Sequence, residues 1–267
     1  MLKINELPFL FTPGVRVGDF SRTLKPGADL FIVNGAPVGV DWPLADGDSC
    51  WLLTRGEIPA AHEMERLLNA RHSPGVQARL KAAVVGIMGL GGLGSAVAVA
   101  LARIGVGRLL LVDCDVVEPT NLNRQQYFLD QIGLPKTEAL QANLARINPY
   151  VQVETWQERL TGERIAQLFA GVDVLAECFD DPVTKAVALR TALTCLQGVG
   201  FVCASGMAGC GDNNAIVTRR LYPGVFLVGD DESEAKPGQG LMAPRVGIAA
   251  HHQANQVVRL LLYGKDA

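Results

Sequence analysis

Apolar runs and helix-like segments alternate along the chain from about residue 82 onward. Short runs rich in Val, Ile and Leu, as expected for buried strands, cover 83–88, 108–112, 151–155, 172–176, 200–204 and 214–218. Longer segments that favour helix cover 93–104, 136–147, 161–169, 182–196 and 245–262. Thr161 and Asp181 are predicted N-caps, because their side chains can accept hydrogen bonds from first-turn amides. The alternation predicts an α/β fold with a doubly wound, mostly parallel sheet.

Residues 1–57 follow a different pattern, in which short apolar runs are separated by turn residues. Strands are predicted at 2–5, 9–12, 30–33 and 49–53, and the amphipathic stretch 17–24 predicts a helix. This order is typical of a small β-grasp unit. A polar, helix-prone segment broken at Pro74-Gly75 follows it. The chain is therefore predicted to have three parts: a β-grasp domain at 1–57, a helical connector at 58–81 and an α/β domain at 82–267.

The composition is that of a folded globular protein, with 49% hydrophobic and 19% charged residues among 267. A net charge of −3 disfavours a nucleic-acid partner. No apolar run reaches the roughly 18 residues of a membrane span, and the N-terminus lacks the apolar core of a signal peptide. We therefore expect a cytoplasmic protein with no membrane partner. The six cysteines form no CxxC pair, so no zinc site is predicted.

The junction between the strand at 83–88 and the helix that follows it is a glycine-rich turn. Gly89, Gly91 and Gly94 form a GxGxxG pattern there, and Gly92 adds a further glycine. Such glycines allow a sharp turn, close approach of backbone amides to phosphate oxygens, and tight packing of helix on strand. Because a helix N-terminus also favours negative charge, the turn predicts a nucleotide phosphate site without saying which nucleotide.

Three polar residues after the turn bear on the identity of the nucleotide. Asp113 ends the second strand, about 20 residues past the glycines, where an acidic side chain binds ribose hydroxyls. Up to this point an NAD-dependent oxidoreductase fits as well as an ATP-dependent enzyme. A triphosphate, however, usually needs fixed cations. Arg124 and Lys136, which follow the ribose position, would supply them, so their joint placement favours ATP.

Asp180 is the candidate metal ligand. It follows the apolar strand at 172–176 and so lies at a strand's carboxyl end, where a carboxylate could hold Mg²⁺ against the phosphates. The neighbouring Asp181 competes for this role, but its place just before Pro182 is that of a helix cap. A second capping role for Asp180 remains open.

Together these residues resemble the ThiF/MoeB group of ubiquitin-activating-like adenylyltransferases. The resemblance covers about 80 to 263 and rests on the glycine turn, Asp113, Asn121-x-Asn123-Arg124-Gln125, Lys136, Asp180, Arg146-Ile147-Asn148-Pro149 and Gly240-Leu241-Met242-Ala243-Pro244. The N-terminal unit looks like a ThiS-type sulfur-carrier fold. The pairing is most similar to the shorter ThiF proteins of thiamine biosynthesis, and it implies a Rossmann-like domain behind a ubiquitin-like one.

The resemblance implies that ATP adenylylates the C-terminal Gly-Gly carboxylate of a ThiS-like sulfur carrier. Arg124 and Lys136 would then grip phosphates, Asp113 the ribose and Asp180 the Mg²⁺. Asn121, Asn123 and Gln125 would complete the nucleotide site together with the glycines at 89, 91, 92 and 94. The family also implies a homodimer in which an arginine enters from the partner subunit's N-terminal segment. Arg71 is the candidate here, with Arg66 as the alternative.

The chain departs from the family pattern in two further respects. The segment before Gly240, where many relatives carry a cysteine, has none, so we expect adenylylation without a covalent sulfur intermediate on this chain. The β-grasp unit has no Gly-Gly and no free end, so it cannot be the carrier and is expected to be a structural or docking domain. The polar stretch 229–240 is read either as a disordered surface loop or as a loop that orders when a partner docks.

Other functions remain open from the sequence. Another enzyme of the same group could activate a molybdopterin-type carrier or a modified tRNA nucleoside, although the −3 charge disfavours tRNA. An NAD-dependent oxidoreductase would have no use for Arg124 and Lys136. An inactive nucleotide-binding scaffold is disfavoured by the intact set of Arg124, Lys136 and Asp180.

Overall fold

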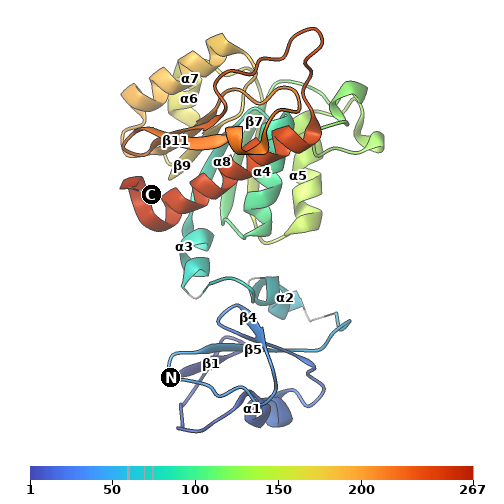
Figure 1. The fold of residues 1–267 in the computed structure, drawn as a ribbon, viewed down its shortest axis with the longest axis vertical. Helices are drawn as coiled ribbons and strands as arrows, with labels where there is room; N and C mark the ends of the chain where they lie inside the picture. The colour runs from blue at the N-terminus through green and yellow to red at the C-terminus, as the bar shows by residue number, and fades with distance from the viewer. Residues whose placement is uncertain (59–60, 69, 74, 267) are drawn as a thin grey trace. The chain divides into compact units, whose positions relative to one another are not determined.

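The computed structural model describes residues 1–58, 61–68, 70–73 and 75–266, with the backbone alone for residues 61, 62, 65 and 66. Contacts between residues divide the chain into two compact units, Met1–Ala78 and Arg79–Ala267 (Figure 1). Among the described residues, no helix is both long enough and apolar enough to cross a membrane.

The first unit is a five-stranded sheet with one helix packed on it. Its elements are β1 (Leu2–Ile4), β2 (Leu7–Phe9), α1 (Val17–Leu24), β3 (Leu30–Val33), β4 (Ala36–Val38) and β5 (Ser49–Leu53), with strand order β2-β1-β5-β3-β4. The first and last strands, β1 and β5, pair in parallel at its centre. Leu2, Leu52 and Val17 are among the residues that fill the core of this unit. The predicted β-grasp arrangement is confirmed.

The chain after β5 folds back onto the same unit. Helix α2 (Ala61–Leu68) leads into a segment whose Ala70 is buried together with Ile32 and Trp51. Close packing continues at Gly35, where a Cβ would lie 2.8 Å from the carbonyl oxygen of His72. Most of the predicted connector therefore shares contacts with the first unit.

The second unit is a seven-stranded sheet with helices on both faces. Its elements are α3 (Val76–Ala82, which crosses the boundary), β6 (Val84–Met88), α4 (Gly92–Arg103), β7 (Arg108–Asp113), α5 (Lys136–Ile147), β8 (Gln152–Gln157), α6 (Gly162–Leu168), β9 (Val174–Glu177), α7 (Pro182–Cys195), β10 (Gly200–Ala204), β11 (Val217–Tyr222), β12 (Val225–Gly229) and α8 (Ala243–Tyr263). The strand order is β11-β12-β10-β9-β6-β7-β8, and only β11 is antiparallel to its neighbour. The predicted doubly wound, mostly parallel α/β fold is confirmed.

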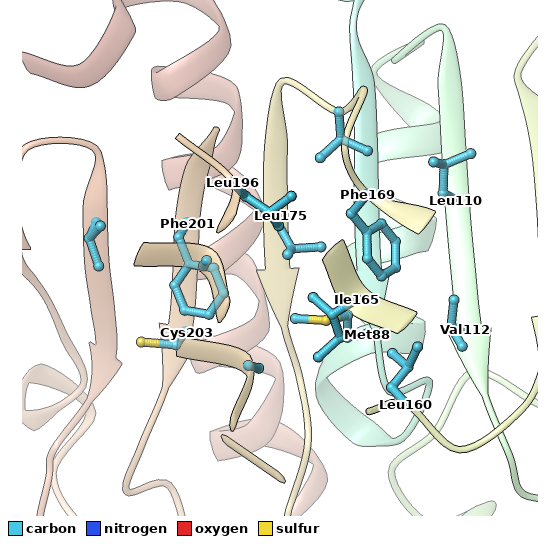
Figure 2. Packing of buried hydrophobic residues seen from close by; sticks show 14 residues of the cluster. Met88, Leu110, Val112, Leu160, Ile165, Phe169, Leu175, Leu196, Phe201 and Cys203 are labelled. Atoms are coloured by element: carbon cyan, nitrogen blue, oxygen red, sulfur yellow. The ribbon is translucent and has the colours of Figure 1, made fainter. Parts of the chain in front are cut away.

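One core cluster of the second unit lies between the sheet and helices α6 and α7. Figure 2 shows Phe169 and Ile165 packed against Leu110 and Met88 of the central strands. Gly86 of β6 makes room for this packing, since a Cβ there would lie 2.5 Å from the Phe169 ring. Such close fitting makes the core sensitive to added volume.

The predicted elements differ from the structure mainly at exposed strands. The short strand β4, which contains Pro37, was not predicted, and β2 begins at Leu7 where 9–12 was expected. One strand was expected at 214–218, whereas the structure has the pair β11 and β12. Strand β11 is an edge strand with mostly exposed side chains, so burial leaves little pattern on its sequence. Both predicted caps are confirmed, because Thr161 and Asp181 accept hydrogen bonds from Arg164 N and Thr184 N.

Candidate active site

A cavity of about 660 Å³ opens at the carboxyl ends of the parallel strands of the second unit. Central strand β6 has β7 on one side and β9 on the other, so chain order reverses here. Such a switch point is where open α/β sheets bind their ligands. Among the predicted site residues, the cavity is lined by Gly89, Gly91, Gly92, Asp113, Arg124, Gln125, Lys136 and Asp180.

The glycine turn connects β6 to α4 at one end of the cavity. Gly89 has a φ of +85°, which favours glycine, and its N–H donates to Val112 O at 2.9 Å. Gly94 does not line the cavity. A Cβ at this position would lie 1.8 Å from Gly89 O, so its absence allows the first turn of α4 to pack under the strand end. The turn therefore presents backbone and helix N-terminus to the cavity.

Asp113 holds this turn in place. Its Oδ2 accepts from Leu90 N at 2.6 Å and its Oδ1 from Asp115 N at 2.8 Å, and the side chain is buried. Burial raises the pKa of Asp113, although Lys136 and the two amides act to lower it. Asp115 was missed by sequence reasoning: its carboxylate is exposed and also lines the cavity. The sequence feature that could have identified Asp115 is its position two residues after Asp113, the last residue of β7.

Lys136 begins α5 and carries a buried ammonium group, with only 6% of the residue exposed. Its Nζ lies 3.0 Å from Asp115 Oδ2, and its backbone N–H donates to Asp115 O at 3.0 Å. Partial burial acts to raise the pKa of Asp115, but the hydrogen bond and charge of Lys136 lower it. A buried cation is therefore fixed at the cavity wall beside a carboxylate that is open to a ligand.

The segment 121–125 places two further polar groups on the wall. The Arg124 guanidinium donates to Thr120 O and Asn123 Oδ1, both neutral oxygens, so its charge is not neutralised by a carboxylate within the described chain. Gln125 is 92% buried, and its Oε1 has no hydrogen-bond partner among the described residues. Asn121 is buried and stabilises the local turn by accepting from Glu118 N; neither it nor Asn123 lines the cavity.

The two neighbouring aspartates after β9 have different environments. Asp181 Oδ2 accepts from Thr184 N at 2.7 Å and from Thr184 Oγ1 at 2.6 Å, and these hydrogen bonds lower its pKa. Asp180 is exposed and makes no hydrogen bond or ion pair with the residues the structure describes. Of the two, Asp180 is therefore the carboxylate available to a cation in the cavity.

An ion pair between half-buried Lys185 and buried Glu177, which sequence reasoning missed, supports this part of the wall. Lys185 Nζ lies 3.0 and 3.2 Å from the Glu177 carboxylate oxygens and donates to Ala204 O at 2.7 Å. Glu177 also accepts from Phe179 N at 2.7 Å. Burial raises the pKa of Glu177 against the opposing effect of Lys185. The pair links the carboxyl ends of β9 and β10 and orients the turn that leads to Asp180.

A further part of the wall is formed by 205–208 and by the start of the polar loop after β12. Arg245 of α8 is buried and donates to Gly211 O, Asp212 O and Asp230 Oδ2, the last at 2.6 Å. The Asp230 carboxylate also accepts from the amides of Glu232 and Ser233. These contacts anchor the beginning of the 229–240 stretch, of which 231–235 line the cavity.

The predicted N-terminal arginines do not belong to this unit. Arg71 is an exposed residue of the first unit, and the side chain of Arg66 lies outside the described residues. The ligand atoms of Asp113, Cys114 and Asp115 lie within 4.8 Å of one another. Backbone amides and Lys136 already engage both carboxylates there, so this group carries no argument for zinc.

The sequence pattern of the ThiF family matches residues 64–266, and that of ThiS-like ubiquitin matches residues 1–56. The chain belongs to the ThiF family. The match extends over three quarters of this ThiF-family chain and includes every residue that lines the cavity.

Named relatives agree with this membership. The chain is 34% identical over 196 residues to the sulfur carrier protein ThiS adenylyltransferase of Escherichia coli (strain K12), covering 69% of this chain and 74% of that protein. It is 33% identical to the molybdopterin-synthase adenylyltransferase of Salmonella typhimurium, covering 72% and 78%. A third relative, the adenylyltransferase and sulfurtransferase UBA4 of Yarrowia lipolytica, is 30% identical, and the match spans 45% of its length.

The fold is shared with a solved structure. The crystal structure of the Escherichia coli tRNA N6-threonylcarbamoyladenosine dehydratase TcdA in complex with ATP aligns with a TM-score of 0.68. The alignment covers 77% of this chain and 97% of that one, at 22% sequence identity.

Proposed function

We propose that this chain is an ATP-dependent adenylyltransferase that activates the C-terminal glycine carboxylate of a ThiS-like sulfur carrier for thiamine biosynthesis. The observation that carries the proposal is the convergence of the glycine turn, Arg124, Lys136 and Asp180 on one cavity. The relative named as a ThiS adenylyltransferase and the ThiS-like first unit support a carrier of this class over a molybdopterin-type one.

The residues suit the chemistry of such a transfer. A carrier carboxylate oxygen attacks the α-phosphorus of ATP, a P–O bond to pyrophosphate breaks, and an acyl-adenylate forms. A carboxylate is ionised at neutral pH, so the site needs no general base and must supply position and charge neutralisation. Arg124 and Lys136 are the fixed cations, and the amides of the glycine turn and the N-terminus of α4 add partial positive charge.

Asp180 is the residue that would hold Mg²⁺. It fits this role because its carboxylate faces the cavity without another partner among the described residues. The ion, when bound, supplies further neutralisation of phosphate charge. We assign no zinc, and no covalent sulfur intermediate, to this chain. Two thiols line the cavity, Cys114 and Cys178. Burial, and next the negative charge of neighbouring carboxylates, raise the pKa of both and disfavour the thiolate.

We further propose a cytoplasmic homodimer in which Arg71 of one subunit completes the site of the other. The first unit supports this role, because it carries Arg71 on a segment packed against its own sheet. It has no free Gly-Gly end, so we assign it a structural or docking role and not that of the carrier.

The proposal is tested by ATP–pyrophosphate exchange with purified carriers that end in Gly-Gly. We expect exchange with a ThiS-type carrier, and less with a molybdopterin-type carrier. Arg124→Ala or Lys136→Ala should lower the exchange rate by about 10²- to 10³-fold, the usual cost of removing an electrostatic contact to a transition state. Arg103→Ala, an exposed arginine at the far end of α4, is the matched control. Absence of exchange with every carrier, alongside tight NAD binding, would refute the proposal.

A second test asks which aspartate, Asp113 or Asp115, binds the ribose hydroxyls of ATP. We expect Asp115→Asn to weaken ATP binding, since its carboxylate is exposed and open to ligand hydroxyls, and to lower the melting temperature because the buried Lys136 ammonium loses its ion pair. Asp113→Asn should also lower the melting temperature, because both of its oxygens hold backbone amides, but should leave the preference for the ribose hydroxyls unchanged. Calorimetric titration with ATP and with 2′,3′-dideoxy-ATP separates the roles. If Asp113 binds the ribose, its substitution alone will abolish the preference for ATP.

A further inference from the structure

Arg159 lies on the cavity wall, and the proposed reaction leaves it without a role. It follows β8 and precedes α6, in the connection that crosses the carboxyl end of the sheet. Strands β7 and β8 pair in parallel with Asp113 opposite Gln157. Asp115 follows Asp113 by two residues, and Arg159 follows Gln157 by two residues. Arg159 therefore lies just past the end of β8, next to the strand end that carries the proposed ribose contact.

The residues on either side of Arg159 in the sequence, Glu158 and Leu160, make contacts with other residues. The Glu158 carboxylate accepts from Arg164 Nε at 3.0 and 2.9 Å, so it does not neutralise Arg159. Leu160 is buried in the main core beside Val112. Arg159 itself is exposed and makes no hydrogen bond or ion pair within the part of the chain that the structure describes. A free cation is thus held at the cavity by a loop whose other side chains are fixed.

The surroundings of Arg159 suit a flat heterocycle. Val112, Leu160 and Pro182 give the cavity apolar lining near this loop. The charge of Arg159 acts at the neighbouring strand end, where it adds to the larger effect of Lys136 in lowering the pKa of Asp115. Strands β6, β7 and β8 are neighbours in the sheet. The proposed phosphate turn follows β6, the proposed ribose contact follows β7, and Arg159 follows β8.

We propose that Arg159 is the base-side contact of the nucleotide, its guanidinium lying over the face of the purine ring. This inference rests on the proposed ATP-binding function. A planar cation over an aromatic ring is attractive, and Arg stacks on rings better than Lys does. The apolar residues beside it exclude water from the ring edge. The contact would supply binding energy for the base, whereas Arg124 and Lys136 act on the phosphates.

The test compares two ligands that differ in whether a base is present. Binding of ATP and of inorganic tripolyphosphate is measured by calorimetry on the full chain and on Arg159→Ala. We expect Arg159→Ala to weaken ATP binding by about 2- to 30-fold, the range that cation–π contacts of about 0.5 to 2 kcal/mol imply. Tripolyphosphate binding should stay unchanged. Arg124→Ala should weaken the binding of both ligands.

Arg103→Ala, an exposed arginine at the far end of α4, is the control, and ATP binding should survive its loss. Equal weakening of ATP and tripolyphosphate by Arg159→Ala would make Arg159 a phosphate contact and overturn the assignment. Unchanged ATP affinity in Arg159→Ala, with a wild type that binds ATP, would overturn it as well. A wild type that binds no ATP would overturn the proposed function along with this assignment.

Discussion

At the scale of single residues, contact distances decide what each position of the glycine turn tolerates. Gly89 needs its positive φ, and a Cβ there would lie 2.9 Å from Cys178 O. Gly94 has no room for a side chain, because of Gly89 O. The sequence pattern predicted both glycines, and it predicted packing and phosphate approach as their reasons. Which glycine serves which purpose follows only from the distances.

Gly94→Ala is therefore expected to be severely disruptive. The added methyl group would overlap Gly89 O, so the turn or the helix must shift, and we expect a loss of at least 1 to 3 kcal/mol in the free energy of unfolding, as for overpacking. ATP binding should be lost with the turn geometry. Thermal unfolding and calorimetric titration measure the two effects. Gly247→Ala in α8, where nothing lies within 4 Å, is the control and should be neutral or stabilising by up to about 1 kcal/mol. Equal unfolding free energies and equal ATP affinities of Gly94→Ala and Gly247→Ala would contradict this prediction.

At the scale of elements, the starts of helices were easier to predict than the ends of strands. Thr161 and Asp181 act through local hydrogen bonds to residues three positions away, so sequence alone identified them. The ion pair of Glu177 with Lys185 joins two strands through a helix, and the anchor of Asp230 to Arg245 joins a loop to α8. These pairs depend on the strand order, which local patterns do not encode.

The anchor between Asp230 and Arg245 makes the cavity loop sensitive to pH. Hydrogen bonds from Ser233, Glu232 and Arg245 outweigh the effect of burial and lower the pKa of Asp230. A carboxyl group with a lowered folded-state pKa stabilises the fold above its unfolded pKa of about 3.9, and this contribution is lost as the pH falls further. The stability difference between the wild type and Asp230→Asn should therefore be largest above about pH 5 and shrink toward pH 2. Thermal unfolding across this range measures it, and a difference independent of pH would show that Asp230 does not act through its charge.

At the scale of the whole molecule, the chain consists of two units with separate cores. The lining of the cavity comes from the second unit alone, whereas Arg71 belongs to the first. Nucleotide binding and carrier activation are therefore expected to depend on different parts of the chain. The sequence did not show where the boundary between the two units lies, because the helical pattern of the polar connector does not indicate which unit it packs against.

A variant that lacks residues 1–75 tests this separation. It keeps α3 and the complete second core, so we expect a cooperative unfolding transition and ATP affinity within about twofold of the full chain. Carrier-dependent pyrophosphate exchange should fall sharply, since the first unit and Arg71 are missing. Arg71→Ala in the full chain should reproduce much of this loss without changing ATP affinity. Full exchange activity in the shortened variant would show that the first unit has no part in the reaction.

The sequence by itself determined the alternation of strands and helices, the glycine turn between β6 and α4, and the two helix caps. Each of these depends on backbone geometry or on hydrogen bonds within a few residues. Only the tertiary structure decided that Asp113 holds two backbone amides while the Asp115 carboxylate is exposed at the cavity, that Asp180 has no partner among the described residues, and that Arg159 and the 231–235 loop share the wall. These groups are far apart along the chain, and they meet because the strand order β9-β6-β7-β8 brings their strand ends to one edge of the sheet.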